Sequence, residues 1–146
     1  MAKVNKTNDA AWTALHRAFR RGNTYLEARL KSAGAPDLDT LAALRLLADK
    51  GVDLSAKQIE KDLLLPQYGV SRLLDRMEQD GLIARNALPA DKRIKLVRLS
   101  KKGAESLRAA LTEYESALAD FWSARMRPGQ SSRLCDLLAH LDRDDA

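Results

Sequence analysis

The sequence has few cysteines, histidines and aromatic residues, and these shortages limit what the protein can do. It contains 146 residues, and its single cysteine, Cys135, excludes a disulfide within the chain. No apolar run approaches the roughly 18 residues that a membrane-spanning helix needs. The first residues also lack the apolar stretch of a secretory signal. We therefore expect a cytoplasmic protein that does not contact a membrane.

Motifs for catalysis and cofactor binding are also missing. There is no glycine-rich nucleotide loop, no HExxH zinc motif and no pair of cysteines, and the two histidines are far apart. The sequence therefore predicts no enzyme activity, no metal site and no cofactor. A small enzyme on a helical scaffold, with chemistry at His16 or Cys135, is the alternative from that class.

Helix-forming residues are abundant instead. Leucine, alanine and arginine are common and aromatic residues are only 5%, a composition that favours helices. Apolar residues at helical spacing predict a long helix over residues 8–33, which Gly34 and Pro36 end. Asp37 is expected to cap a second helix, and Gly51 to end it.

The next stretch has the signals of two helices joined by a tight turn. Ser55 and Gln58 have the spacing of a capping box, which predicts a short helix. Pro66 suits the first turn of the following helix, because its missing N–H group has no helical partner there. Gly81 ends that helix, so the segment reads as a helix-turn-helix.

A predicted hairpin follows the helix-turn-helix. Residues 82–86 and 93–99 are β-leaning, and residues 88–91 between them, Leu-Pro-Ala-Asp, favour a turn. A helix-turn-helix followed by two strands is a winged helix. The predicted fold is mainly α with a small β-hairpin wing (α+β). We expect one domain of residues 1–146 with its winged helix-turn-helix core at 37–100.

Long helices flank this core on both sides. After Ser100, five apolar residues with a 4-3-4-3 spacing predict a helix with a packing seam. They are Leu107, Leu111, Tyr114, Leu118 and Phe121. A last helix carries a stripe of leucines. We expect residues 8–33 and 101–146 to form dimerisation helices whose stripes bury one another and those of a second copy.

The positive charge is concentrated in one quarter of the chain. Residues 66–102 contain nine lysine and arginine side chains and four aspartate and glutamate side chains. This segment therefore carries the whole net charge of +5. Such a concentration is typical of a protein that binds a polyanion such as DNA. A solvated basic face is the alternative interpretation.

The helix that begins at Pro66 has two distinct faces. Four apolar residues are expected in the core: Val70, Leu73, Leu74 and Met77. The N-terminal half presents four polar ones to the outside: Gln67, Tyr68, Ser71 and Arg72. Arginine and glutamine pair with the major-groove edges of guanine and adenine, and such N-terminal residues reach bases in helix-turn-helix proteins. Arg76 is expected at a phosphate. An amphipathic surface helix with incidental arginines is the competing interpretation.

Basic residues also gather on the predicted wing. Lys92, Arg93 and Lys95 lie at the tip and outer edge of the hairpin. Cations at such a tip suit a narrow, A·T-rich minor groove, which has an enhanced negative potential. Cations are also common at the tip of any soluble hairpin.

Residues 54–103 resemble the winged-helix core of the multiple-antibiotic-resistance regulator (MarR) family. The resemblance rests on LSAKQIEKDLLL, VSRLLDRMEQDGLIAR and DKRIKLVRLSKKG. It implies a homodimeric transcription factor, a repressor that binds pseudo-palindromic promoter DNA and is released by a small ligand. Ser71 and Arg72 fall on the recognition-helix positions. Asp91 and Arg93 fall on the Asp-x-Arg of the wing, where the aspartate orients the arginine.

Two residues depart from the family pattern. Gly69 stands where threonine or alanine is usual, which costs ~1 kcal/mol of helix propensity against alanine. We expect it to allow a close approach of the backbone to DNA or to the preceding helix. Tyr68 is bulky for its position, which leaves the base preference open.

The resemblance also implies a small aromatic or phenolic ligand between the terminal helices and the core. Trp12, His16 and Arg20 share one side of the first helix and are candidates to contact the ring and its carboxylate. Packing at a dimer seam is the alternative for them. Cys135 is expected to be a packed, inert thiol, because Arg133 points elsewhere. An oxidant-sensing regulator acting through Cys135, or a winged-helix protein-interaction module without DNA binding, is the alternative function.

Overall fold

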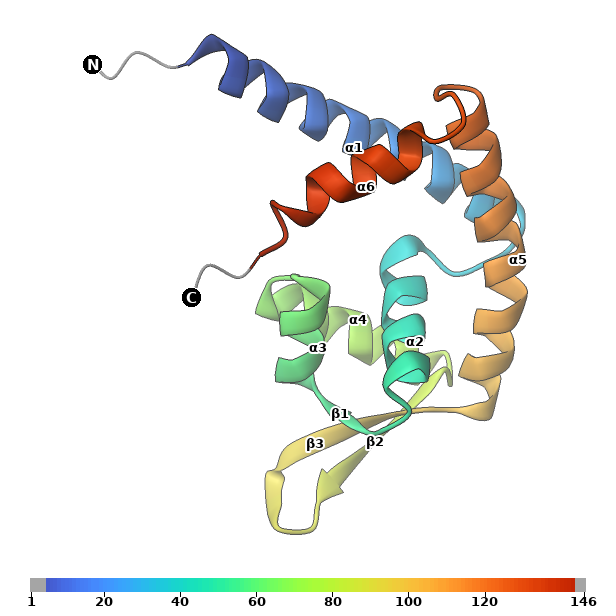
Figure 1. The fold of residues 1–146 in the computed structure, drawn as a ribbon. Coiled ribbons are helices and arrows are strands. Elements are labelled where there is room, and N and C mark those ends of the chain that lie inside the picture. Colours follow the sequence, from blue (N-terminus) through green and yellow to red (C-terminus); the bar gives the residue numbers. More distant parts are fainter. Residues whose placement is uncertain (1–4, 144–146) are drawn as a thin grey trace.

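The computed structural model describes residues 5–143, which form helices above and around a small sheet (Figure 1). The helices are α1 (Lys6–Ser32), α2 (Leu38–Lys50), α3 (Ala56–Leu63), α4 (Gln67–Gln79), α5 (Lys101–Ser123) and α6 (Gln130–Ala139). The strands are β1 (Leu54–Ser55), β2 (Ile83–Leu88) and β3 (Asp91–Leu99). Figure 1 shows α1 and α6 at the top and the sheet at the bottom, with α5 running between the two levels.

The predicted caps set the ends of the helices. Asp37 Oδ1 accepts the Thr40 N–H at 2.9 Å to begin α2, and Gly51 ends it in the left-handed conformation (φ 63°). Ser55 and Gln58 form both bonds of the capping box, which begins α3. Pro66 is the N-cap of α4 rather than part of its first turn. These local signals therefore fix the order of the helices, as predicted.

The sheet is larger than the predicted two-stranded hairpin. β2 and β3 pair antiparallel around a turn at residues 89–90, but β1 pairs with the other edge of β3. Leu54 lies opposite Val97, and both side chains are buried. The predicted hairpin of two strands is confirmed, and the sequence analysis missed only the short strand β1, which attaches the wing to the start of α3.

The hydrophobic core lies between α2, α3, α4, the sheet and the first half of α5. The four apolar residues predicted on the inner face of α4 are all buried there. Leu44, Ile59 and Met77 have no exposed surface. Burial of these side chains holds α4 in place and leaves its other face outside.

Helix α5 packs within its own chain along a seam that differs from the predicted one. Leu107 and Phe121 are buried as expected, but Leu111 and Leu118 are only half-buried. Small residues take their places in the seam: Gly103, Ala110 and Ala117. The seam therefore brings α5 close to α1 and α2 of the same chain.

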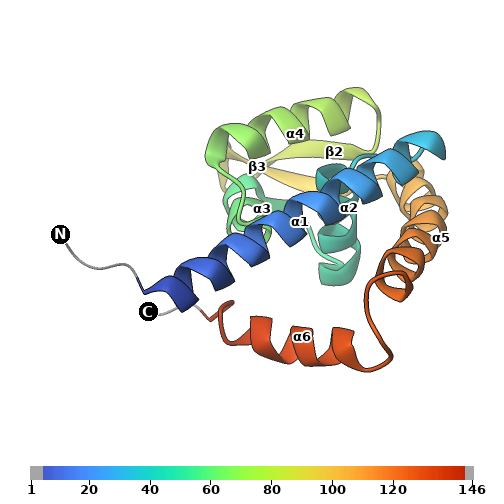
Figure 2. The same cartoon turned by 90° about the horizontal axis from the view of Figure 1, so that it is seen from above.

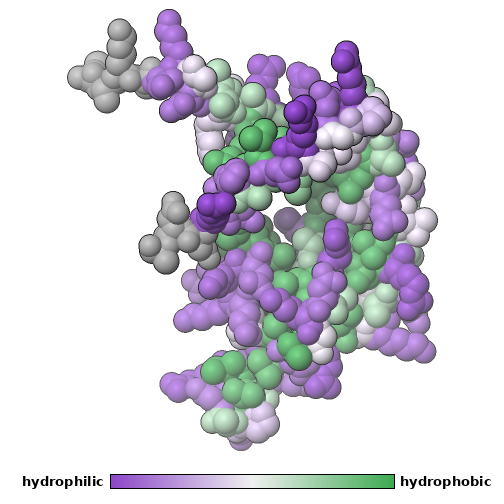
Figure 3. All heavy atoms as spheres, viewed as in Figure 1, coloured by the Kyte–Doolittle hydropathy of each residue, from purple (hydrophilic) through white to green (hydrophobic). Residues whose placement is uncertain are grey.

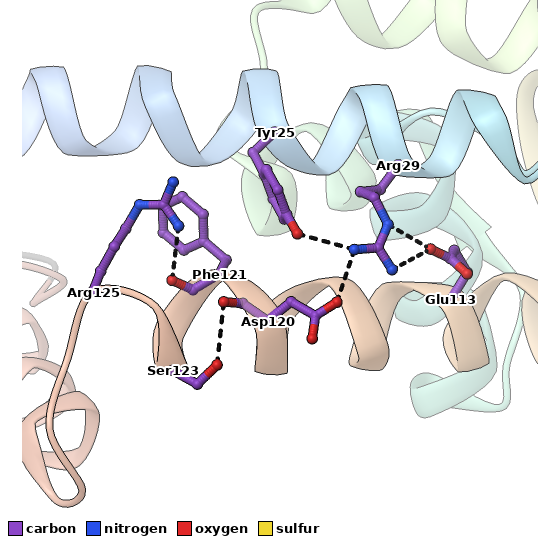
Figure 4. A network of polar contacts seen from close by, with 7 residues as sticks. All are labelled: Tyr25, Arg29, Glu113, Asp120, Phe121, Ser123 and Arg125. Carbon is purple, nitrogen blue, oxygen red and sulfur yellow. Dashed lines mark hydrogen bonds and ion pairs between the residues drawn. The ribbon is translucent and has the colours of Figure 1, made fainter.

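An arginine joins α1 to α5 (Figure 4). Arg29 Nε donates to Glu113 Oε1, and one of its terminal nitrogens donates to Tyr25 Oη and Asp120 Oδ2, each at 2.9 Å. These acceptors raise the pKa of Arg29, so the guanidinium stays charged. The network fixes α1 across the upper half of α5.

The layer of α1 and α6 is poorly covered by the rest of the chain. Figure 2 shows α6 apart from the sheet and from most of α1, and no residue of α6 is buried. Four large apolar side chains of this layer are exposed: Trp12, Phe19, Leu137 and Leu141. Figure 3 shows apolar surface there and a hollow below it. Cys135 is exposed in the chain, so the prediction of a packed thiol was wrong.

No helix within residues 5–143 is both long enough and apolar enough to cross a bilayer.

Candidate nucleic-acid interface

The outer face of α4 carries the four polar side chains predicted to contact DNA. Leu64 ends α3 in the left-handed conformation (φ 53°), and Pro66 begins the next helix, which turns α4 away from α3. Gln67, Tyr68, Ser71 and Arg72 are all exposed, Tyr68 at 70%. Arg72 makes no hydrogen bond or ion pair with any residue between 5 and 143. The structure therefore brings these four side chains together with their polar groups outward.

Arg76 has a different environment from Arg72. One of its terminal nitrogens lies 2.7 Å from Asp37 Oδ2 and donates to Thr40 Oγ1 at 3.2 Å. Asp37 also caps α2, so Arg76 ties the last turn of α4 to the start of α2. The phosphate contact expected for Arg76 stays a prediction. In the structure, Arg76 also holds α4 against α2 through Asp37.

The wing holds Arg93 in a fixed direction. Asp91 Oδ1 accepts the Arg93 N–H at 3.0 Å and Nε at 3.1 Å, and Asp91 Oδ2 accepts a terminal nitrogen at 3.1 Å. Arg93 holds the pKa of the Asp91 carboxyl below its usual value, while the Arg93 side chain is 91% exposed. These bonds are consistent with the orienting role expected for Asp91, which stays a prediction.

Arg85 links the wing to α4, and the sequence-based predictions missed it. From β2 it reaches Asp75 Oδ1 at 2.7 Å and Glu78 Oε2 at 2.9 Å, both on α4. Its side chain is only 20% exposed, and it lowers the pKa of Glu78. Arg85 therefore sets the angle between the wing and α4, which residue spacing alone does not reveal.

Lys57 is a further basic residue that sequence reasoning overlooked. A groove of about 460 Å³ separates the start of α3 from β3, and Lys57, Arg93 and Lys95 line it. Lys92 and Lys95 are exposed and form no ion pair in the described part of the chain. The groove opens between cations on both sides, an arrangement suited to a phosphodiester.

The three ligand candidates on α1 are only partly brought together. Trp12 and His16 line a groove of about 500 Å³ with Phe19 and Leu64, but Arg20 is not among its lining residues. Asp142, near the end of α6, is the other ionisable side chain there. The groove is therefore mainly apolar, and the structure does not bring the predicted arginine to it. Among residues 5–143, no cluster of three or more His, Cys, Asp or Glu side chains suits a metal ion.

Comparison with known proteins identifies the winged segment. Residues 35–94 match the model of the MarR family. Over 89 residues the chain is 32% identical to the HTH-type transcriptional regulator MhqR of Bacillus subtilis, a match that covers 61% of this chain and 60% of that protein. The chain thus spans less than two thirds of this relative's length. The relative is named as a regulator and not as an enzyme, in agreement with the expected absence of enzyme activity.

Solved structures share the fold over nearly the whole chain. Sco3205, a MarR family transcriptional regulator from Streptomyces coelicolor in complex with DNA, has a TM-score of 0.82 at 19% identity. The match covers 97% of this chain and 89% of that one. BpsR of Bordetella bronchiseptica, whose DNA binding is regulated by 6-hydroxynicotinic acid, has a TM-score of 0.83 at 20% identity. That match covers 98% and 100% of the two chains. The winged-helix fold with long flanking helices is therefore confirmed.

Proposed function

We propose that the chain is a MarR-family, sequence-specific DNA-binding regulator of transcription, because residues 35–94 match the model of that family and a transcriptional regulator is 32% identical over 89 residues. Residues 37–100 form the DNA-binding core in this proposal. The observation that carries it is the outer face of α4, where Arg72 is exposed and unpaired within the described residues. An arginine held free on such a helix pairs with guanine O6 and N7.

The wing and the start of α3 extend this contact along the duplex. Arg93, oriented by Asp91, enters the minor groove with Lys92 and Lys95 beside it. Lys57 lies across the groove from Arg93 and Lys95, so the phosphodiester backbone between the two DNA grooves meets cations from both sides. Each neutralised phosphate steepens the salt dependence of binding.

We also propose that the protein acts as a homodimer. The exposed apolar side chains of α1 and α6 gather on one layer, and a patch of this kind is typical of an interaction site. Residues 8–33 and 101–146 supply the dimerisation helices. Two recognition helices held about 34–36 Å apart read two half-sites one DNA turn apart, which requires a pseudo-palindromic site.

In this proposal the dimer occupies promoter DNA as a repressor in the cytoplasm, and a small aromatic or phenolic ligand releases it. The apolar groove with Trp12 and His16 is the candidate ligand site. Release requires a ligand that binds the non-DNA-binding arrangement more tightly, because only differential affinity shifts an equilibrium. Exposure of Cys135 keeps the oxidant-sensing alternative open. DNA release is measured with peroxide and with aromatic acids, in the wild type and in Cys135→Ser. Release by peroxide that is lost in Cys135→Ser would indicate oxidant sensing, and release by aromatic acids in both proteins would indicate ligand sensing.

Selection of bound duplexes from a random pool tests the proposed function. We expect enriched duplexes with inverted half-sites about 10 base pairs apart. The logarithm of the affinity should fall with the logarithm of salt concentration by about 0.9 for each phosphate neutralised. A purified dimer with negligible, salt-insensitive affinity for every duplex would instead favour a protein-interaction module.

A further inference from the structure

The first turn of α5 is bonded to the chain segment that directly follows α4. Three successive backbone carbonyls of this segment accept hydrogen bonds from two residues of α5 or its cap. The bonds run from Lys102 Nζ to Asp80 O (2.6 Å), from Ser100 Oγ to Gly81 O (2.6 Å) and from Ser100 N to Leu82 O (3.1 Å). We call this contact the α4–α5 junction.

The end of α4 makes these carbonyls available. Gly81 adopts the left-handed conformation (φ 73°), and the Leu82 N–H returns to Met77 O at 2.9 Å. This arrangement closes the last turn of α4 with N–H groups of its own segment. The Asp80, Gly81 and Leu82 carbonyls lie beyond α4 and accept from Ser100 and Lys102, so the start of α5 holds the segment that follows α4.

Gly103 brings the two backbones into direct contact. A Cβ atom at this position would lie 2.1 Å from Leu82 O and 2.9 Å from Leu99 Cδ1. No side chain fits there, so α5 lies against the segment after α4 with no flexible spacer. Ser100 also caps α5 through the Gly103 N–H, at 2.9 Å. Contacts this close transmit small displacements rather than absorbing them.

Helix α5 continues from this junction to the layer that the proposed dimer uses. Its upper half is joined to α1 by the Arg29 network (Figure 4). The last turn of α4 is also fixed to α2 through Arg76 and Asp37. Among the described residues, the side chains of Gln67, Ser71 and Arg72 have no such ties. The C-terminal end of α4 is therefore the point at which its direction is set.

We propose that Ser100 and Lys102 are positioning residues that determine which half-site spacing the dimer accepts. The inference rests on the proposed function, since it concerns two recognition helices on one duplex. One added base pair moves a half-site by about 3.4 Å and turns it by about 34° around the duplex axis. A rigid α4–α5 junction prevents the recognition helix from following that movement, whereas a loosened junction allows it.

The test compares duplexes that differ only in half-site spacing. Affinities are measured for the selected spacing, for one or two base pairs more or fewer, and for a single half-site. The wild type should lose roughly tenfold or more in affinity for each base pair added or removed. Lys102→Met, which keeps the aliphatic stem but loses the donor, should reduce that loss to roughly threefold or less. Ser100→Asp combined with Lys102→Met keeps a cap for α5 and should flatten the profile further.

Matched controls separate positioning from charge and folding. Lys101→Met removes a neighbouring cation that makes no hydrogen bond with any described residue, and its spacing profile should match that of the wild type. Ser100→Thr retains the hydroxyl that caps α5 and donates to Gly81 O, so its affinities across the half-site spacings should match those of the wild type. Affinity for a single half-site should change equally in Lys101→Met and Lys102→Met.

Each outcome has a distinct meaning. A wild-type spacing preference that persists unchanged in Lys102→Met and in the double variant would overturn the inference and leave the proposed function intact. A loss of half-site affinity in Lys102→Met beyond that of Lys101→Met would also overturn it, because the junction would then support α4 itself. A wild type with no spacing preference would contradict the proposed dimer on two half-sites, and the inference would fail with it.

Discussion

The winged core and the layer of α1 and α6 use apolar side chains in opposite ways. In the core, Leu44, Ile59 and Met77 have no exposed surface. In the upper layer, Trp12 is 69% exposed and Leu141 is 70% exposed. The core is thus completed by its own chain, whereas the layer has apolar stripes that its own chain does not cover. A second copy supplies the missing surface in the proposed dimer.

Within the winged core, the arginines differ in how they are paired. Arg85, Arg93 and Arg76 are each held by carboxylates on or beside the winged core. Arg72 is left without such a partner in the described chain, at the centre of the proposed DNA-binding face. The paired arginines fix the geometry of the interface, and the unpaired one is available to a base.

The largest expected effect comes from opening a cavity in the core. Leu44→Ala should lower the free energy of unfolding by about 2–5 kcal/mol, because a fully buried leucine is lost from a packed site. Urea denaturation at several protein concentrations measures it, and the loss should be the same at each. Val52→Ala, at a position 61% exposed, is the control and should change stability by less than about 0.5 kcal/mol. An equal loss of unfolding free energy in Leu44→Ala and Val52→Ala would contradict the claim that the core alone depends on its buried side chains.

Removing apolar side chains from the upper layer should act on association instead. Trp12→Ala with Leu141→Ala should raise the dimer Kd by roughly 30-fold or more, as expected for aromatic anchors of an interface. Sedimentation equilibrium measures the Kd. Lys31→Ala, an exposed change elsewhere on α1, is the control. An unchanged Kd in the double variant would mean that this layer is not the dimer interface.

A small gain is expected on the recognition helix. Gly69→Ala should raise the free energy of unfolding by about 0.5–1 kcal/mol, because glycine is unfavourable inside a helix. The added Cβ would meet only Pro66, at 3.5 and 3.6 Å, which is ordinary contact. Gly69 therefore does not serve a close approach to the preceding helix, and its expected close approach to DNA stays a prediction. Thermal or urea unfolding gives the stability, and a decrease would contradict this reading.

The helix boundaries were predictable because their signals are local. Asp37, Ser55, Gly51 and Gly81 act on residues within one turn, and the structure uses each of them as the spacing suggested. The apolar face of α4 was also predictable, because its period follows from helical geometry alone.

The contacts that the sequence did not reveal connect distant segments. Strand β1 has two residues, too few for an alternating pattern, and its partner Val97 lies far along the chain. The seam of α5 was assigned to the largest residues, whereas close packing selected Gly103 and Ala110. Arg76 was expected only at a phosphate, and its contact with Asp37 was missed because nothing in its surroundings in the sequence points to that residue.

The most direct test of the account is the affinity of Arg72→Ala for the selected duplex and for variants of each base pair in the half-site. We predict a loss of about 1–3 kcal/mol in binding free energy and a loss of preference at one base pair per half-site. Lys61→Ala, an exposed change on α3 outside the groove beside the wing, is the matched control and should keep that preference. Unchanged affinity and unchanged base preference in Arg72→Ala would contradict the account.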